Sequence, residues 1–270
     1  MVTVETEMLA ETPGVQSPAE RSASANGALT AIHLPGLVSY LPMWERQRAL
    51  AVARQQGEID DVLLLLEHEH VYTNGRRGDR RHLLVDEVTL AQLGAAYHKV
   101  DRGGDITYHG PGQLVGYAIV DLDQAGLSVR GYVRDLERAI VQTVAAFGVQ
   151  ADIVPGFTGV WVGDEKLAAI GVKVSYGVAY HGFALNVAPD LSYFRHITPC
   201  GISDRGVTSL ARLTGQEITV AEVVPVYAQA FAATFNVDLC WTLPNEHGER
   251  QPVNRLGNGH ERSDVLNTYW

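Results

Sequence analysis

Two side chains in this sequence have the chemistry of a nucleophile and its base. Cys200 stands between a proline and a glycine in the run Thr198-Pro-Cys-Gly-Ile-Ser, and Lys166 begins the apolar run Lys166-Leu-Ala-Ala-Ile-Gly. A thiol (pKa about 8.5) is a stronger acid than an ammonium group (pKa about 10.4), so proton transfer from Cys200 to Lys166 is downhill by about 2.6 kcal/mol if the two meet. The pair would rest as thiolate and ammonium, and a thiolate attacks acyl carbon.

Strand periodicity predicts where Lys166 points. The alternate residues that follow it are Ala168, Ile170, Val172 and Val174, all apolar. An unbroken strand therefore directs the lysine toward the core side. Two alternatives stay open: Lys166 lies at a hairpin end and bends into water, or a β-bulge breaks the alternation.

The stretch from Arg102 to Gln113, Arg-Gly-Gly-Asp-Ile-Thr-Tyr-His-Gly-Pro-Gly-Gln, holds four glycines. Glycines allow close backbone approach to a ligand. The stretch lacks the P-loop pattern. It does not open a helix as dinucleotide-binding loops do, because Pro111 and the apolar run after it predict a strand. Its mixture of Arg, His, Tyr and Thr favours a ligand-binding loop over a plain surface turn.

Histidines offer an alternative base and a weak hint of metal. His109 could pair with Cys200 as in thiol hydrolases, and His181 and His196 are further candidates, although a lone histidine is more often structural. His68 and His70 share one strand face. Because no third ligand follows at a recognisable spacing, we expect no metal site.

One short segment of this acidic chain is strongly basic. The net charge of −10 argues against general nucleic-acid binding, which needs a basic face. Arg76, Arg77, Arg80 and Arg81 nevertheless lie within six residues. The simple interpretation is a solvated loop, and the functional one is a docking patch for an acidic partner.

The elements that must position these residues follow from pattern and capping. Helices are predicted at residues 43–56, 86–96, 128–147 (capped by Ser128) and 219–235 (with a capping box). Strands are predicted at 62–67, 97–101, 160–162, 166–175 and 178–188. Without regular βαβ alternation, these predict an α+β single domain with a central mixed or antiparallel sheet flanked by helices.

The two ends differ from the middle. Residues 1–27 predict a disordered N-terminal extension, residues 28–243 a catalytic domain, and residues 244–270 a polar tail that is loose or only partly docked. No secretory signal and no membrane-length apolar run is present, and two cysteines suit a reducing compartment, so we expect a cytoplasmic protein. Cys240 is expected to be a buried small hydrophobe.

Four motifs in order resemble those of the lipoyl(octanoyl) transferases of lipoate biosynthesis. They are Arg102 to Gln113, Lys166 to Gly171, His181-Gly-Phe-Ala-Leu-Asn-Val and Pro199-Cys-Gly-Ile-Ser, within a resemblance over about residues 30–240. Asp105 departs from the pattern, since the family more often carries an amide or other polar residue there. The resemblance implies the biotin/lipoate protein ligase-like fold. It also implies transfer of an octanoyl group from octanoyl-acyl carrier protein to the target lysine of lipoyl domains, those of 2-oxoacid dehydrogenase complexes and the glycine cleavage H protein.

The resemblance also assigns residues. It implies that Cys200 carries the acyl thioester and that Lys166 is its partner. It implies substrate contacts at Arg102, Gly103, Gly104, Asp105, Ile106, Thr107, Tyr108, His109, Ala169, Ile170, Gly171, Gly182, Phe183 and Ala184. We expect no cofactor, no metal, no nucleic-acid partner and no membrane.

Two alternatives remain. One is an ATP-dependent lipoate or biotin protein ligase, which would need a phosphate-binding lysine near its glycine loop. No lysine lies between Arg102 and Gln113. The other is a non-catalytic acyl-binding protein. Neither needs a thiol, so Cys200 argues against both.

Overall fold

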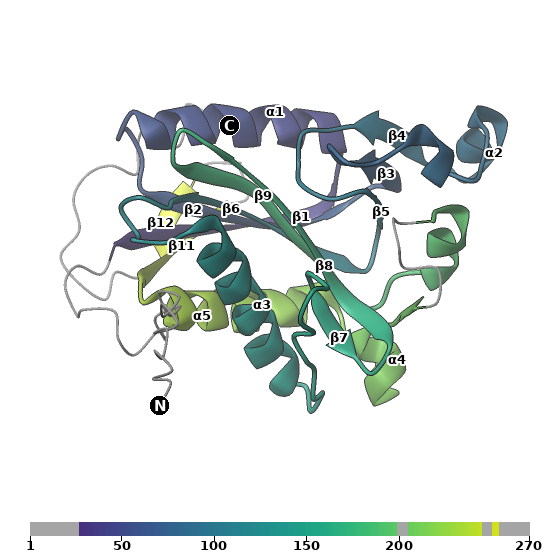
Figure 1. The fold of residues 1–270 in the computed structure, drawn as a ribbon. Helices are drawn as coiled ribbons and strands as arrows, with labels where there is room; N and C mark the ends of the chain where they lie inside the picture. The colour runs from purple at the N-terminus through teal and green to yellow at the C-terminus, as the bar shows by residue number, and fades with distance from the viewer. Residues whose placement is uncertain (1–26, 199–204, 245–249, 254–270) are drawn as a thin grey trace, which may run out of the picture.

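The computed structural model describes residues 27–198, 205–244 and 250–253 (Figure 1). Its elements in chain order are β1 (Ala28–Val38), α1 (Tyr40–Gln55), β2 (Asp61–His68), β3 (Val71–Asn74), a 3₁₀ helix (Arg80–His82), α2 (Glu87–Gln92), β4 (Ala96–Lys99), β5 (Ile106–His109), β6 (Gln113–Asp121), α3 (Val129–Ala145), β7 (Val160–Val162), β8 (Glu165–Ser175), β9 (Val178–Asn186), a second 3₁₀ helix (Leu191–His196), β10 (Gly206–Val207), α4 (Leu210–Thr214), α5 (Val220–Phe235), β11 (Asp238–Pro244) and β12 (Arg250–Val253). Cys200 lies outside the described residues, and so does the predicted disordered extension apart from Gly27.

The main sheet has the order β10-β8-β9-β6-β2-β1-β11-β12, with β7 paired to β8. The β8–β9, β9–β6 and β6–β2 pairs are antiparallel, whereas β2–β1, β1–β11 and β10–β8 are parallel. The predicted mixed sheet is therefore confirmed. Part of the predicted polar tail extends this sheet, because β12 pairs with β11.

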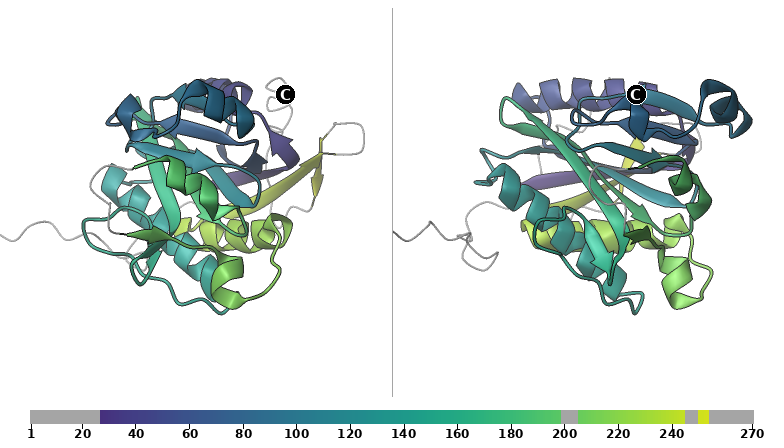
Figure 2. Two further views of the ribbon diagram at one scale, coloured as in Figure 1. Left: turned by 90° about the vertical axis from the view of Figure 1, so that its right-hand side faces the viewer. Right: turned by 45° about the vertical axis from the view of Figure 1, so that its right-hand side comes forward.

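Helices cover both faces of the sheet (Figures 1 and 2). Val62, Leu64 and Leu66 of β2 pack with residues of α1, whereas Leu63 and Leu65 pack with residues of α3 and α5. Successive strand side chains point to opposite faces, so a strand buried on both sides needs an unbroken apolar run. That is the physical reason for the sequence of β2.

The helix starts follow the predicted caps. The Gly131 N–H donates to Ser128 Oγ at 3.1 Å at the start of α3, and Thr219 and Glu222 form the capping box of α5. The meander β7–β8–β9 is confirmed as well. The predicted helix at 86–96 is shorter, because α2 ends at Gln92 and Gly94 has a φ of +61°.

A second sheet, β4-β3-β5, lies at one end of the molecule (Figure 2). It holds β5, which is the middle of the glycine-rich stretch from Arg102 to Gln113 (called the glycine loop below). The core of this sheet includes Tyr72 and Tyr108. The loop is therefore fixed between two sheets.

Two further expectations concern Cys240 and membranes. Cys240 is half-buried in β11 rather than fully buried, because the strand lies near the edge of the sheet. In the described part of the chain, no helix combines the length and the apolar character needed to cross a bilayer.

Candidate active site

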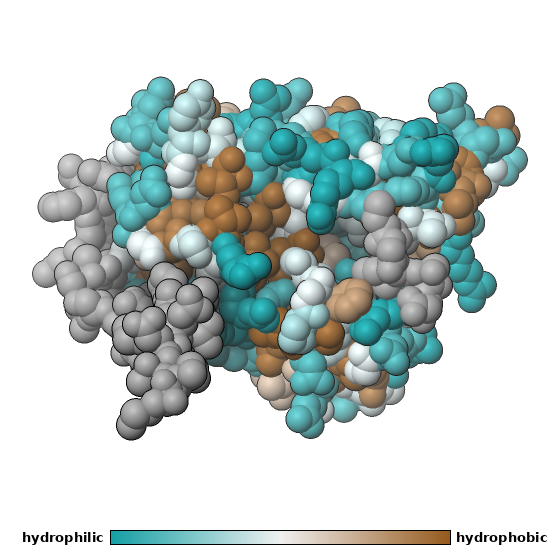
Figure 3. Space-filling model, viewed as in Figure 1, coloured by the Kyte–Doolittle hydropathy of each residue, from teal (hydrophilic) through white to brown (hydrophobic). Residues whose placement is uncertain are grey.

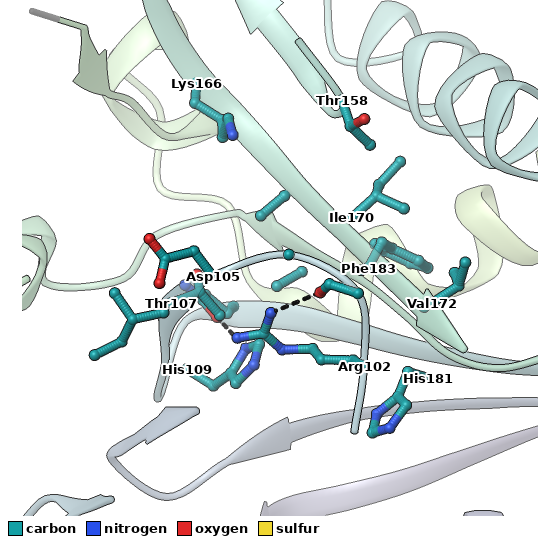
Figure 4. A pocket seen from close by; sticks show the side chains of 18 of the residues that line it. Arg102, Asp105, Thr107, His109, Thr158, Lys166, Ile170, Val172, His181 and Phe183 are labelled. Atoms are coloured by element: carbon teal, nitrogen blue, oxygen red, sulfur yellow. Dashed lines mark hydrogen bonds between the residues drawn. The ribbon is translucent and has the colours of Figure 1, made fainter. Parts of the chain in front are cut away.

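A cavity of about 660 Å³ lies between β8, β9 and the glycine loop. It brings together nearly all of the predicted site residues that the structure describes. The predicted residues on its wall are Arg102, Gly103, Gly104, Asp105, Ile106, Thr107, His109, Lys166, Ala169, Ile170, Gly171, Gly182, Phe183 and Ala184. Segments far apart in the sequence thus form one wall (Figure 4).

Tyr108 is the predicted contact residue that this wall does not include. Its ring is fully buried in the core of the small sheet, stacked on Tyr193, and its hydroxyl lies 2.7 Å from His70 Nδ1. Neighbouring residues of β5 point to opposite faces, so Tyr108 supports the loop from behind.

Lys166 is held by strands on both sides. In β8 it lies opposite Trp161 of β7 on one side and opposite Val207 of β10 on the other. The Thr208 N–H donates to the Lys166 carbonyl oxygen at 3.0 Å. Figure 4 shows its side chain reaching from β8 into the cavity. Lys166 does lie at a hairpin end, as the second residue of β8 after the turn from β7, but its half-buried side chain lines the cavity.

The Lys166 side chain packs against an aromatic ring, and the Arg205 guanidinium lies 5.2 Å from the centre of the same ring. Lys166 Nζ lies 4.7 Å from the centre of this buried Trp161 ring, and no carboxylate pairs with it among the described residues. Burial lowers the pKa of Lys166 because desolvation disfavours the ammonium form. A negative charge close to Lys166 would oppose this shift and favour the ammonium form.

A β-bulge in β8 next to Lys166 breaks the alternation of side chains that the sequence suggested, as the second alternative expected. Trp161 pairs with Lys166 but Val160 pairs with Ala168, so Leu167 is an extra residue on β8. Leu167 and Ala168 are both fully buried in the core that α3 and α5 cover. The alternation therefore holds from Ala168 onward, and the bulge directs Lys166 toward the cavity instead of that core.

The glycine loop docks on an open edge of β8. Beyond Ala168 the outer side of this strand has no neighbouring strand among the described residues, and the Gly103 N–H donates to the Val172 carbonyl oxygen at 2.9 Å. A Cβ at Gly171 would lie 2.8 Å from the Gly103 carbonyl oxygen. Gly171 is thus required for the loop to approach the strand.

Gly182 has a different role, although it lies opposite Gly171. A Cβ there would lie 2.1 Å from the Gly116 carbonyl oxygen of β6. Its small size therefore serves strand packing inside the main sheet, whereas Ala169 and Ala184 leave space in the cavity.

Arg102 fixes the start of the loop. Its buried guanidinium donates to the carbonyl and hydroxyl oxygens of Thr73 and to the Gly103 carbonyl oxygen. Burial lowers the pKa of Arg102. The next wall residue with a charge, Asp105, lies 2.8 Å from His82 Nδ1.

The preceding residue, Asp101, ties the loop to three other elements. Its carboxylate accepts hydrogen bonds from Trp44 Nε1, Lys173 Nζ and the Tyr180 hydroxyl at 2.8–2.9 Å, and from His181 Nε2 at 2.8 Å. Burial alone would raise the pKa of Asp101, but these hydrogen bonds outweigh it and lower that pKa.

The candidate histidine bases are already engaged. Burial holds the pKa of His109 well below its usual value. Its ring nitrogens lie 3.3 Å from Thr73 Oγ1 and from Gln113 Oε1. His181 binds Asp101, burial lowers its pKa, and its Nδ1 is buried without a hydrogen-bond partner among the described residues. His196 packs edge-on against Tyr193 and does not line the cavity.

The sequence did not single out four polar cavity residues. Tyr40, Tyr117, Thr158 and Asn186 all line the wall. Asn186 donates from Nδ2 to the Thr208 carbonyl oxygen at 2.9 Å and accepts from Gln113 Nε2 at 2.9 Å. It belongs to the motif that begins at His181, which was a usable signal, whereas nothing in the sequence marks Tyr40.

His68 and His70 have other partners. His68 lies 2.6 Å from the Val38 carbonyl oxygen and 2.7 Å from the Tyr117 hydroxyl. Within residues 27–198, 205–244 and 250–253, no three His, Cys, Asp or Glu side chains are grouped to hold a metal ion.

Comparison with known proteins agrees with this geometry. Residues 39–232 match the lipoyl protein ligase A/B catalytic domain. An octanoyltransferase of Solibacter usitatus is 48% identical over 76% of this chain and 92% of its own length, and one of Rubrobacter xylanophilus is 52% identical over 73% and 89%. The chain belongs to the octanoyltransferases. This family lies within the lipoyl protein ligase A/B group.

A solved structure shares the fold of this chain. A T. acidophilum protein described as a lipoate protein ligase, with lipoic acid bound, superposes with a TM-score of 0.63 at 18% identity, over 82% of this chain and 91% of that one. At this identity the likeness concerns the fold alone, and it confirms the predicted ligase-like architecture.

Proposed function

We propose that this octanoyltransferase moves an octanoyl group from the thioester of acyl carrier protein to the target lysine of a lipoyl domain, through an S-octanoyl intermediate on Cys200. One observation carries the assignment of the nucleophile. Ile197, Lys166 and Val207 line one cavity, and Ile197 and Val207 flank Cys200 on either side in the sequence. The chain therefore enters and leaves the Cys200 segment at the wall that holds Lys166.

The first half-reaction uses Lys166 as an acid. The Cys200 thiolate attacks the thioester carbonyl carbon, the carbon–sulfur bond to the carrier breaks, and the departing carrier sulfur takes a proton from the Lys166 ammonium. The products are S-octanoyl-Cys200, the carrier thiol and neutral Lys166. A thiolate beside Lys166 offsets the desolvation that lowers the pKa of this lysine.

The second half-reaction uses Lys166 as a base. Acylation removes the thiolate charge, so burial alone acts on Lys166 and favours its neutral form. The amine of the incoming lysine attacks the thioester, its proton passes to Lys166, and the carbon–sulfur bond to Cys200 breaks. The octanoyl group is now an amide, and enzyme thiolate and ammonium are restored.

The wall of the cavity suits an acyl chain next to a polar reaction centre. Ile170, Val172 and Phe183 supply apolar surface, and Ala169 and Ala184 are small. A binding site that is mainly apolar with a few placed polar groups is usual for small ligands. Arg102, Gly103, Gly104, Asp105, Ile106, Thr107 and His109 would close the opposite side.

The competing function is an ATP-dependent lipoate or biotin ligase on the same fold. A thioester donor needs no activation, so the two functions separate in one experiment. We would incubate the full chain with octanoyl-carrier protein and a lipoyl domain without ATP, and record the intact masses of all three proteins. We expect the lipoyl domain to gain one octanoyl group and the carrier to lose one. A strict ATP requirement would refute the proposal.

Acceptors in this proposal are lipoyl domains of 2-oxoacid dehydrogenase complexes and the glycine cleavage H protein. A reducing compartment, the cytoplasm, would keep Cys200 as a thiol.

A further inference from the structure

The four arginines singled out in the sequence form one basic surface. We call Arg76, Arg77, Arg80 and Arg81 the arginine surface. All four are exposed, in a chain whose net charge is −10. Hydrophilic side chains cover much of the end of the molecule that carries β4 and α2 (Figure 3). A cluster of cationic side chains on an acidic protein attracts an acidic partner.

The backbone beneath this surface is tied down. Lys99 Nζ donates to the carbonyl oxygens of Gly75 and Gly78 at 2.7 and 2.6 Å. The Arg76 N–H donates to the Arg102 carbonyl oxygen at 3.0 Å and the Arg77 N–H to that of Gly104 at 3.1 Å. The surface and the glycine loop of the cavity are thus hydrogen-bonded to each other.

The four side chains are not equivalent. Arg81 pairs with Asp79 at 2.7 Å, and the Arg80 guanidinium lies 4.8 Å from the centre of the Tyr97 ring. The side chains of Arg76 and Arg77 have no hydrogen-bond or ion-pair partner in the part of the chain that the structure describes. These two guanidiniums are available to a partner.

The arginine surface continues into the reaction centre at two points. Arg77 itself lines the cavity. The Thr198 N–H donates to the His82 carbonyl oxygen at 2.8 Å, and the Leu84 N–H donates to the His196 carbonyl oxygen at 2.9 Å. The chain that leads to Cys200 is therefore paired with the segment that directly follows Arg81.

We propose that the arginine surface docks the carrier protein of the acyl donor, with Arg77 at the mouth of the cavity. This inference rests on the proposed function. The donor thiol ends an arm that contains a phosphodiester, and guanidinium groups bind phosphate and carboxylate oxygens well. Leu84 and Val88, which are 58% and 66% exposed, add apolar contact beside the charges.

The acceptor domain fits this surface less well. Its reacting amine ends a lysine side chain, which is shorter than the carrier's arm. The acceptor protein must therefore sit directly over the cavity mouth. The carrier's arm allows its protein body to rest farther away, where Arg80 and Arg81 lie on the next turn of chain.

The test compares two donors in single-turnover formation of the octanoyl enzyme. Octanoyl-carrier protein presents the protein surface, and octanoyl-pantetheine lacks both the protein and the phosphate. The quantity is the ratio of kcat/KM for the first donor to that for the second. In the double variant Arg76→Glu/Arg77→Glu we expect this ratio to fall about tenfold at low ionic strength, and less at about 0.5 M salt because screening shortens electrostatic range.

Arg130→Glu is the matched control. Arg130 is an exposed arginine in the first turn of α3, where an acidic residue suits the helix dipole, and we expect a wild-type ratio. An unchanged ratio in the double variant would overturn the docking surface. In the complete transfer reaction with a lipoyl domain added, a rise confined to the KM for that domain would also overturn it, in favour of the acceptor. If the wild-type chain forms no octanoyl adduct with either donor, the proposed function itself is wrong, and the docking proposal falls with it.

Discussion

Val207 lies directly opposite Lys166 across the parallel pair of β10 and β8. These two residues are 41 positions apart by their numbers in the chain, and the adjoining Thr208 N–H binds the Lys166 carbonyl oxygen at 3.0 Å. The pairing fixes one end of the Cys200 segment beside the proposed base.

Replacing the proposed base, Lys166, should slow the alkylation of Cys200. Because the chain has two cysteines, a Cys240→Ser background leaves Cys200 as the single reactive thiol. In that background Lys166→Ala should slow alkylation at pH 7 by about tenfold or more, since a thiol of pKa about 8.5 is only a few per cent ionised there. The pH at half-maximal rate should move up toward 8.5. An unchanged pH profile would remove Lys166 as the activating base.

A variant of His109 tests the alternative in which a histidine activates Cys200. Burial holds the pKa of His109 well below its usual value, and Gln113 and Thr73 lie within hydrogen-bonding distance of its ring nitrogens. In the same Cys240→Ser background, His109→Gln should therefore keep an alkylation rate within about twofold of the parent. Circular dichroism would show that the variant is folded. A loss as large as that of Lys166→Ala would assign the base to His109.

Replacing Gly171 and replacing Gly182 by alanine should impair the protein in different ways. Gly171→Ala places a Cβ 2.8 Å from the Gly103 carbonyl oxygen, so it should displace the loop and impair octanoyl transfer at a cost of about 1–3 kcal/mol in unfolding free energy. Gly182→Ala, with its Cβ 2.1 Å from the Gly116 carbonyl oxygen, should destabilise the central sheet more.

Denaturant unfolding and single-turnover assays would separate the two effects. Gly27, around which an added Cβ meets nothing within 4 Å, is the control position. Equal stability of Gly171→Ala and Gly182→Ala would contradict the assignment of separate roles.

Asp101 should make stability depend on pH. Hydrogen bonds from His181, Lys173 and Tyr180 outweigh burial and lower its pKa, so its contribution is present above the unfolded pKa of about 3.9 and is lost as pH falls below that value. At pH 7, Asp101→Asn should cost about 2–3 kcal/mol, because hydrogen bonds to a charged group are lost.

Urea unfolding of both proteins between about pH 3 and pH 7 would test this. The difference between wild type and Asp101→Asn should shrink on the acid side. A difference that stays constant down to the lowest pH would show that the ionised carboxylate is not what stabilises the loop.

Asn186 should position the chain beyond Cys200. Asn186→Ala removes the hydrogen bonds to the Thr208 carbonyl oxygen and from Gln113 and leaves buried polar groups unpaired, at about 1–3 kcal/mol. We expect a fall in kcat for octanoyl-enzyme formation with a smaller change in KM for octanoyl-pantetheine. The reverse pattern would mark Asn186 as a substrate contact instead.

The sequence by itself determined most of the framework. Hydrophobic alternation, the Ser128 cap and the Thr219–Glu222 capping box placed the helices and the meander, because these are local interactions whose partners lie within a few residues. The unusual residue types of the glycine loop and of the Lys166 run also marked the cavity wall before its shape was known.

Only the tertiary structure decided how these parts meet. The bulge at Leu167, the open edge of β8 that receives Gly103, and the pairing of Val207 with Lys166 each depend on contacts between residues far apart in the chain. Periodicity of one strand carries no information about its neighbours. For that reason residue spacing could not predict the direction of Lys166, the role of Gly182 in sheet packing or the position of Tyr108 behind the loop.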